Sequence, residues 1–188
     1  MNSMADKILQ FYLLIMAIPL AKMIEVVSKN PEYNSIIRFS ILLVVVIEWV
    51  YSQTSFTSKY EYLPQNNLTK NIATIFSEIG VCVSVAIAAY KIENEISFYT
   101  FMVAFFIFDL ITQFLTKPSK RSHPMRKVTI IWVSLDILES FLFSSIILFA
   151  NYNLMSESIR ASSIFIVVTL IALFDFIKNR DFYFDEAV

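Results

Sequence analysis

The sequence has very little glycine: its 188 residues include only Gly80. Membrane helices use glycine for close packing, and transporters use glycine and proline to break helices around a substrate. The shortage therefore disfavours a transporter with large moving gates. It also predicts that any close contacts between helices use small residues of other types. The candidates are Ser84, Ala86, Ala88 and Ala89.

Cysteine and histidine each occur once. Cys82 lies inside an apolar segment, so the chain can form no internal disulfide and has no paired-cysteine motif. His123 has no second histidine or cysteine near it, which favours a solvated loop residue over a transition-metal ligand. The sequence also has no GxSxG, no HExxH and no phosphate-binding glycine loop. We therefore expect neither catalysis nor a cofactor.

Charged residues are scarce as well. They make up 16% of the chain, against about a quarter in a soluble domain, while 57% of the residues are hydrophobic. The charges gather in the gaps between apolar runs, which is the pattern of membrane spans. The net charge of −1 disfavours a nucleic-acid partner. The composition thus predicts an all-α polytopic membrane protein whose main surroundings are the lipid bilayer.

Six apolar runs are long enough to cross or nearly cross a bilayer as helices. They predict a six-transmembrane-helix bundle that forms a single transmembrane domain over residues 1–188. The expected spans are 8–24, 36–51, 71–90, 97–116, 128–152 and 161–177. Because the link 91–95 is short, the third and fourth spans should form a tight antiparallel hairpin. The longest loop is expected at 52–70.

A weak internal repeat suggests three helical hairpins of similar design. Glu48, Asp109 and Asp175 each sit between two apolar residues near the end of an even-numbered span. The separation of 61 residues between Glu48 and Asp109 recurs between Glu78 and Glu139. The alternative is chance recurrence, which this apolar composition makes easy.

The basic residues predict the orientation of the chain. Ten fall on one side: Lys7, Lys59, Lys70, Lys117, Lys120, Arg121, Arg126, Lys127, Lys178 and Arg180. Five fall on the other: Lys22, Lys29, Arg38, Lys91 and Arg160. The positive-inside rule then places both termini in the cytoplasm, for a protein of the cell's inner membrane. The most basic loop, 117–127, should contact anionic lipid headgroups or, alternatively, a cytoplasmic protein partner.

Carboxylates inside the apolar runs are the candidate functional residues. Asp136 and Glu139 lie three residues apart, so they point the same way on a helix. In the predicted topology Glu78, Asp109, Asp136 and Glu139 all fall in the cytoplasmic half. A charge at that depth needs a partner, a proton or a water-filled space. These acids therefore predict a cavity, open to the cytoplasm, that suits a cation, a proton or an amine. If a metal binds, oxygen ligands favour Mg²⁺ or Ca²⁺.

A structural role for the same acids is the alternative. The deeper ones would hydrogen-bond to Ser77, Ser134 or Ser140 and hold helices together. Glu48 and Asp175, near the span ends, would sit at the interface and pair with loop lysines and arginines. Aromatic residues at span ends are expected in interfacial belts: Trp49, Tyr51, Tyr60, Tyr62, Phe182, Tyr183 and Phe184.

Three classes of function fit these features. The first is a non-enzymatic membrane subunit, namely an anchor, a sensor or a pore-forming effector of a multi-component system such as a defence system. The second is a cation- or proton-coupled transporter or channel, and the third an intramembrane enzyme that acts on lipid headgroups. The lack of soluble mass and of catalytic motifs favours the first. We also expect a homo-oligomer, because a single small bundle would not easily shield so many carboxylates from lipid.

Overall fold

The structure is a computed structural model, and it describes residues 14, 17, 20–29, 31–59, 68–115 and 123–184. Within these ranges all regular secondary structure is helical. The labelled helices are α2 (Tyr33–Lys59), α3 (Leu68–Tyr90), α4 (Glu95–Leu115), α5 (His123–Asn151), α6 (Glu157–Lys178) and the short α7 (Arg180–Phe184). Residues 20–29 are helical as well.

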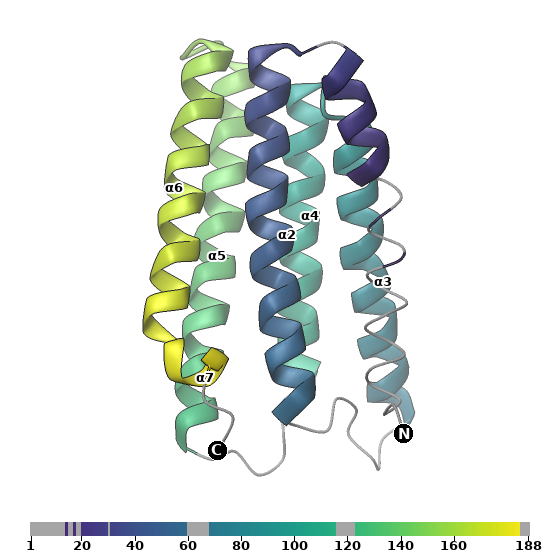
Figure 1. Cartoon of the computed structure of the whole chain (residues 1–188), viewed down its shortest axis with the longest axis vertical. Helices are drawn as coiled ribbons and strands as arrows, with labels where there is room; N and C mark the ends of the chain where they lie inside the picture. The colour runs from purple at the N-terminus through teal and green to yellow at the C-terminus, as the bar shows by residue number, and fades with distance from the viewer. Residues whose placement is uncertain are drawn as a thin grey trace.

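The five long helices run alternately up and down along one axis (Figure 1). Helices α3, α4, α5, α6 and α2 pack against one another in that order, and α2 returns to touch α3 weakly. The helical residues 20–29 add to this packing, because Met23 is fully buried in the main apolar core. The short α7 lies at one end of the bundle, which we call the α7 end (Figure 1).

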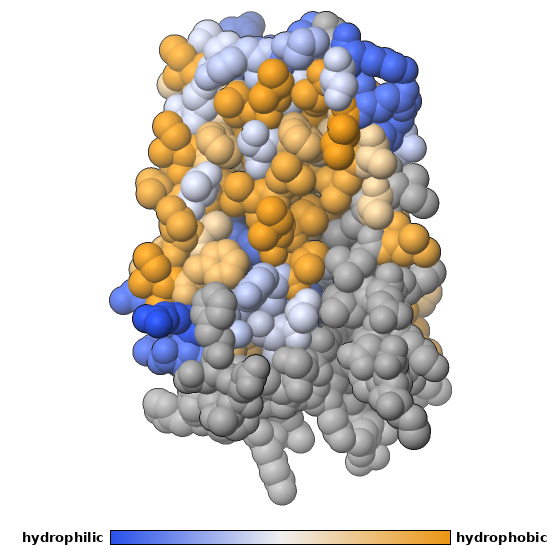
Figure 2. Space-filling model, viewed as in Figure 1, coloured by the Kyte–Doolittle hydropathy of each residue, from blue (hydrophilic) through white to orange (hydrophobic). Residues whose placement is uncertain are grey.

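Five helices of the described residues are long and apolar enough to cross a membrane. Figure 2 shows the apolar side chains as a broad band around the visible face, with hydrophilic residues gathered above it. This pattern is that of a helical membrane protein. The predicted first span, 8–24, lies largely outside the described residues, so the count of six stays a prediction.

The helices extend further into polar sequence than predicted. Helix α2 continues to Lys59, so the prediction that the loop begins at residue 52 was wrong. Helix α5 begins at His123 rather than at residue 128. Residues 25–29, expected in a link, are also helical. At the end of α2, Ser52 and Thr54 return hydrogen bonds to the carbonyls of Trp49 and Val50. Polar residues at a helix end do not stop it when water or its own backbone satisfies them.

The predicted hairpin of the third and fourth spans is confirmed. Residues 91–94 make the turn, in which the N–H of Asn94 donates to the carbonyl of Lys91 at 2.9 Å. The Asn94 side chain then accepts from the N–H of Ser97 at 2.9 Å, as an N-cap does. Gly80 of α3 faces Phe108 of α4 so closely that a Cβ built on it would lie 2.5 Å from the ring. The one glycine therefore permits this hairpin to close.

Aromatic rings fill the half of the bundle opposite the α7 end. Phe105 packs edge-on against Phe106, with centroids 5.0 Å apart. From Phe106 the ring contacts continue to Phe143 and then to Tyr99, at 5.5 and 5.8 Å. These four side chains are almost completely buried. They form a continuous apolar seal through the centre of the bundle.

Two buried arginines fasten the end of the bundle opposite α7. Arg38 donates to Glu157 at 2.5 Å and to the carbonyl of Ile92 at 2.5 Å. Arg160 binds both carboxylate oxygens of Glu95, at 2.8 and 2.5 Å. The sequence pattern indicates nothing of this role, yet Arg38 and Arg160 are only 1% and 5% exposed. They therefore tie α2 and α4 to α6.

Candidate functional site

A cavity lies inside the bundle between α2, α4, α5 and α6. Its volume is about 30 Å³, which holds one or two water-sized species. The lining includes five carboxyl side chains: Glu48, Asp109, Asp136, Glu139 and Asp175. Among the described residues that line it, none is lysine, arginine or histidine. Its remaining wall is mainly apolar and aromatic, and includes Trp49 and Trp132.

The three acids of the weak sequence repeat meet here. Glu48 comes from α2, Asp109 from α4 and Asp175 from α6, and all three line the cavity. Asp175 is fully buried in the bundle, and its depth relative to the membrane interface stays a prediction. Glu48 is only partly buried, and in Figure 2 a small hydrophilic patch is visible within the apolar band, between the front helix α2 and α6.

Asp109 and Asp136 are linked through one amide group. Gln113 donates from Nε2 to Asp109 at 2.9 Å and to Asp136 at 2.5 Å. Asp109 also accepts from the Trp49 indole at 3.0 Å. Two carboxyl groups that share one amide donor, with no basic side chain among the described residues of the lining, repel when both are ionised. The pair therefore needs a proton or a bound cation.

Glu139 lies on the same helix as Asp136 and also faces the cavity. It is 2% exposed, and its Oε1 has no hydrogen-bond partner among the described residues. A buried carboxylate oxygen without a partner is costly. Glu139 is therefore the lining residue that most needs an additional species in the cavity.

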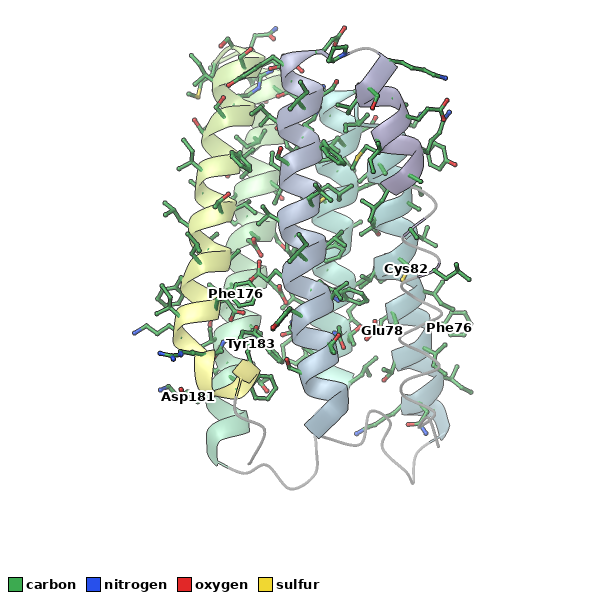
Figure 3. The ribbon with its side chains drawn as sticks, viewed as in Figure 1. Phe76, Glu78, Cys82, Phe176, Asp181 and Tyr183 are labelled. Carbon is green, nitrogen blue, oxygen red and sulfur yellow. The ribbon has the colours of Figure 1, made fainter. Side chains whose placement is uncertain are left out.

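Asp175 connects the cavity to α7. It accepts hydrogen bonds from the Tyr183 hydroxyl and, at 2.6 Å, from Asn179. The Tyr183 oxygen in turn accepts from the Trp132 indole at 3.1 Å. Burial, reinforced by the Asp175 carboxyl, raises the pKa of Tyr183, so its hydroxyl stays protonated and able to donate. Figure 3 shows Tyr183 and Phe176 together at the α7 end, and their ring centroids are 5.2 Å apart.

Of the four acids that the sequence predicted in a cavity, three line it and one does not. Asp109, Asp136 and Glu139 line the cavity, whereas Glu78 of α3 does not. Glu78 is fully buried, and Figure 3 shows it facing the bundle while Phe76 points outward. Glu48 and Asp175 join the site instead. Among the described residues, no group of three or more His, Cys, Asp or Glu is arranged to hold a metal ion.

The expected serine partners of the acids were wrong. Ser77 and Ser134 donate to carbonyls of their own helices, from Thr74 and Ile130, and Ser140 has no hydrogen-bond partner among the described residues. The actual partners are Trp49, Gln113 and residues of the C-terminal turn. Trp49 was expected in an interfacial belt, yet it is only 3% exposed. The only hint in the sequence was that Trp49 directly follows Glu48, an acid inside an apolar run.

Most of the basic loop 117–127 lies outside the described residues. Lys117, Lys120, Arg121 and the side chain of Arg126 fall outside the described part of the chain. Lys127 is exposed at the start of α5. The predicted contacts of this loop with headgroups or a partner stay predictions.

The fold and the cavity define this chain as a helical integral membrane protein with an acidic interior site. No family model, no curated protein and no solved structure matches the chain.

Proposed function

We propose that the protein is a non-enzymatic integral membrane subunit that binds a small monovalent cation in its acidic cavity. The observation that carries this proposal is Glu139, a cavity acid that is 2% exposed and whose Oε1 lacks a hydrogen-bond partner among the described residues. Among the residues that the structure describes, five carboxyls and no basic side chain line the space. A site of this composition in a low-dielectric bundle attracts positive charge and excludes anions.

The position of the cavity supports binding from one side. Helices α4 and α6 reach it with residues near their last turns, and Asp175 joins it to α7. On the other side lie the aromatic seal and the two arginine ion pairs. A site closed at one end favours a sensor or ligand-binding subunit over an open pore.

The α7 end is proposed to face the cytoplasm. Among the described residues, Lys70, Lys127 and Arg180 are exposed there. On the opposite side Lys22, Lys29 and Lys91 are exposed too, but Lys22 and Lys29 pair with Glu25. Arg38 and Arg160 are buried in ion pairs, so they add little free positive charge. The asymmetry of exposed positive charge agrees with cytoplasmic termini in the inner membrane. The cavity would then face the cytoplasm.

The two tryptophans supply the test. Trp49 and Trp132 are the only ones in the chain, and both line the cavity. Protein in nanodiscs is titrated with ammonium, potassium and sodium chloride at constant pH and ionic strength, with N-methylglucamine as the replacement cation. At least one salt should change the tryptophan fluorescence saturably. Glu139→Gln should weaken that response about tenfold or more, because a charged ligand is lost.

The matched control is Glu78→Gln, which removes a fully buried acid outside the cavity. It should keep the wild-type response. If the wild-type protein responds to none of the salts, or if both variants lose the response equally, the proposed site is wrong.

Cation- or proton-coupled transport is the second candidate. It is favoured by the line of carboxyls from Glu139 through Asp136 and Asp109, which Gln113 helps to connect. In sealed proteoliposomes a transporter or channel would move the bound cation or protons across the membrane. A subunit that only binds would leave internal pH and cation content unchanged while keeping the fluorescence response.

Self-association also stays a proposal, but its original reason is weaker. One chain alone keeps Glu78, Asp109, Asp136, Glu139 and Asp175 each under 9% exposed. Shielding these acids therefore does not require a second copy. Cross-linking in native membranes would detect a dimer or a larger species, and a protein that stays monomeric under cross-linking would exclude the homo-oligomer.

A further inference from the structure

We propose that the cation is ammonium or the ammonium group of a very small primary amine. This inference rests on the proposed function and names the chemical class that the site takes. The species must fit the cavity, carry positive charge and supply the hydrogen bonds that the lining lacks.

The lining has used all its side-chain donors. The Trp49 indole donates to Asp109, and the Trp132 indole donates to Tyr183. The Ser52 hydroxyl donates to the carbonyl of Trp49. Gln113 places its Nε2 on Asp109 and Asp136. Among the described residues that line the cavity, no side-chain N–H or O–H group outside the carboxyls is left for a ligand.

Acceptors, in contrast, are in excess. Glu139 Oε1 and Gln113 Oε1 both belong to the lining and have no partner among the described residues. The bonds that Gln113 makes to two carboxyls fix the orientation of its amide, so Oε1 can only accept. A ligand that satisfies both oxygens must either donate hydrogen bonds or be a metal cation.

The other features favour an N–H donor over a metal. The described residues contain no cluster of three acidic, histidine or cysteine side chains arranged to hold a metal ion. The walls carry the indoles of Trp49 and Trp132, whose faces attract ammonium groups. The volume of about 30 Å³ suits an ion about as large as water and excludes a bulky organic cation. Water alone fits the volume but balances no charge, so it would suffice only if the acids were all protonated.

Potassium is the matched probe, because its ion is close to ammonium in size and charge but has no N–H group. In nanodiscs at fixed pH and ionic strength, ammonium chloride should change the tryptophan fluorescence at concentrations at least about tenfold lower than potassium chloride does. Methylammonium should act like ammonium, and tetramethylammonium, which has no N–H and is larger, should have no effect. In Glu139→Gln the preference for ammonium should fall below about twofold, while Glu78→Gln should keep it.

The possible results separate the two proposals. Equal responses to ammonium, potassium and sodium would overturn the ammonium assignment but leave cation binding intact. A response to pH alone, with none to any salt, would show a proton-only site and overturn both the ammonium assignment and the proposed cation site. No response to salts or pH would overturn both. The comparison of ammonium with potassium uses the wild-type protein, so it stands even if a variant fails to assemble.

Discussion

Tyr183 of α7 donates its hydroxyl hydrogen to Asp175, an acid of the cavity wall. The same hydroxyl accepts from the indole of Trp132 on α5. One phenol thus joins α5, α6 and α7 at the edge of the acidic site. A change in the charge of Asp175 would therefore alter the hydrogen bond from Tyr183 of α7.

Tyr183→Phe should loosen α7. It removes a hydrogen bond to a charged group, which is worth about 1.5–3 kcal/mol, so local opening should become roughly tenfold more frequent. Trypsin cleavage at Arg180, which is exposed in α7, measures that opening in nanodiscs. Tyr90→Phe, at an exposed position of α3, is the control and should cleave like wild type. An unchanged rate in Tyr183→Phe would mean that this bond does not hold α7.

Gly80→Ala should destabilise the bundle. The new Cβ would lie 2.5–2.7 Å from ring atoms of Phe108, so either this ring or the two helices must shift. Overpacking costs about 1–3 kcal/mol, while the better helix propensity of alanine returns up to about 1 kcal/mol. We expect a net loss of about 1–2 kcal/mol in unfolding free energy, measured by denaturation in mixed micelles. Ser163→Ala on the exposed face of α6 should change it by less than about 0.5 kcal/mol.

Glu95→Ala should be among the most damaging substitutions at the end opposite α7. It leaves the guanidinium of Arg160, only 5% exposed, without its carboxylate. Breaking a buried ion pair by removing one partner costs about 3–5 kcal/mol. The control is Glu25→Ala, which breaks exposed pairs with Lys22 and Lys29 and should cost less than about 1 kcal/mol. Similar melting curves for the two variants would refute a fastening role for Arg160.

Reporter fusions at Asn94 and Ser119 test the orientation. Asn94 lies in the turn between α3 and α4, at the end opposite α7. Ser119 lies in the sequence between α4 and α5. We expect a cytoplasmic signal at Ser119 and the opposite signal at Asn94. The same signal at both positions would exclude the predicted topology. A cytoplasmic signal at Asn94 with the opposite signal at Ser119 would exclude a cavity that faces the cytoplasm.

The sequence predicted well what depends on local pattern. The apolar runs predicted helices α2 to α6, and the short link 91–95 predicted the hairpin of α3 and α4. The three-residue spacing of Asp136 and Glu139 placed both acids on the cavity. These features follow from helix periodicity and from the cost of burying polar backbone in lipid, which act within one segment.

What the sequence did not predict depends on contacts between distant segments. Trp49 meets Asp109 across 60 residues, and Arg160 meets Glu95 across 65. Hydropathy and spacing do not show which indole or guanidinium faces which acid. Asp175 illustrates the same limit, because its sequence position did not indicate its hydrogen bonds to Asn179 and to Tyr183 of α7. Tertiary packing decided these positions.

The central claim, that the cavity binds a cation through its carboxylates, is tested most directly with Asp136→Asn combined with Glu139→Gln. The melting temperature of the protein in nanodiscs is measured with and without the monovalent salt that gives the strongest fluorescence response, at constant ionic strength. At about 100 times the apparent dissociation constant, the wild-type value should rise by roughly 5–10 °C. The double variant should assemble, melt no lower than wild type without salt because the cost of burying charge is gone, and show no rise. A double variant whose melting temperature still rises as much as that of wild type would contradict the claim.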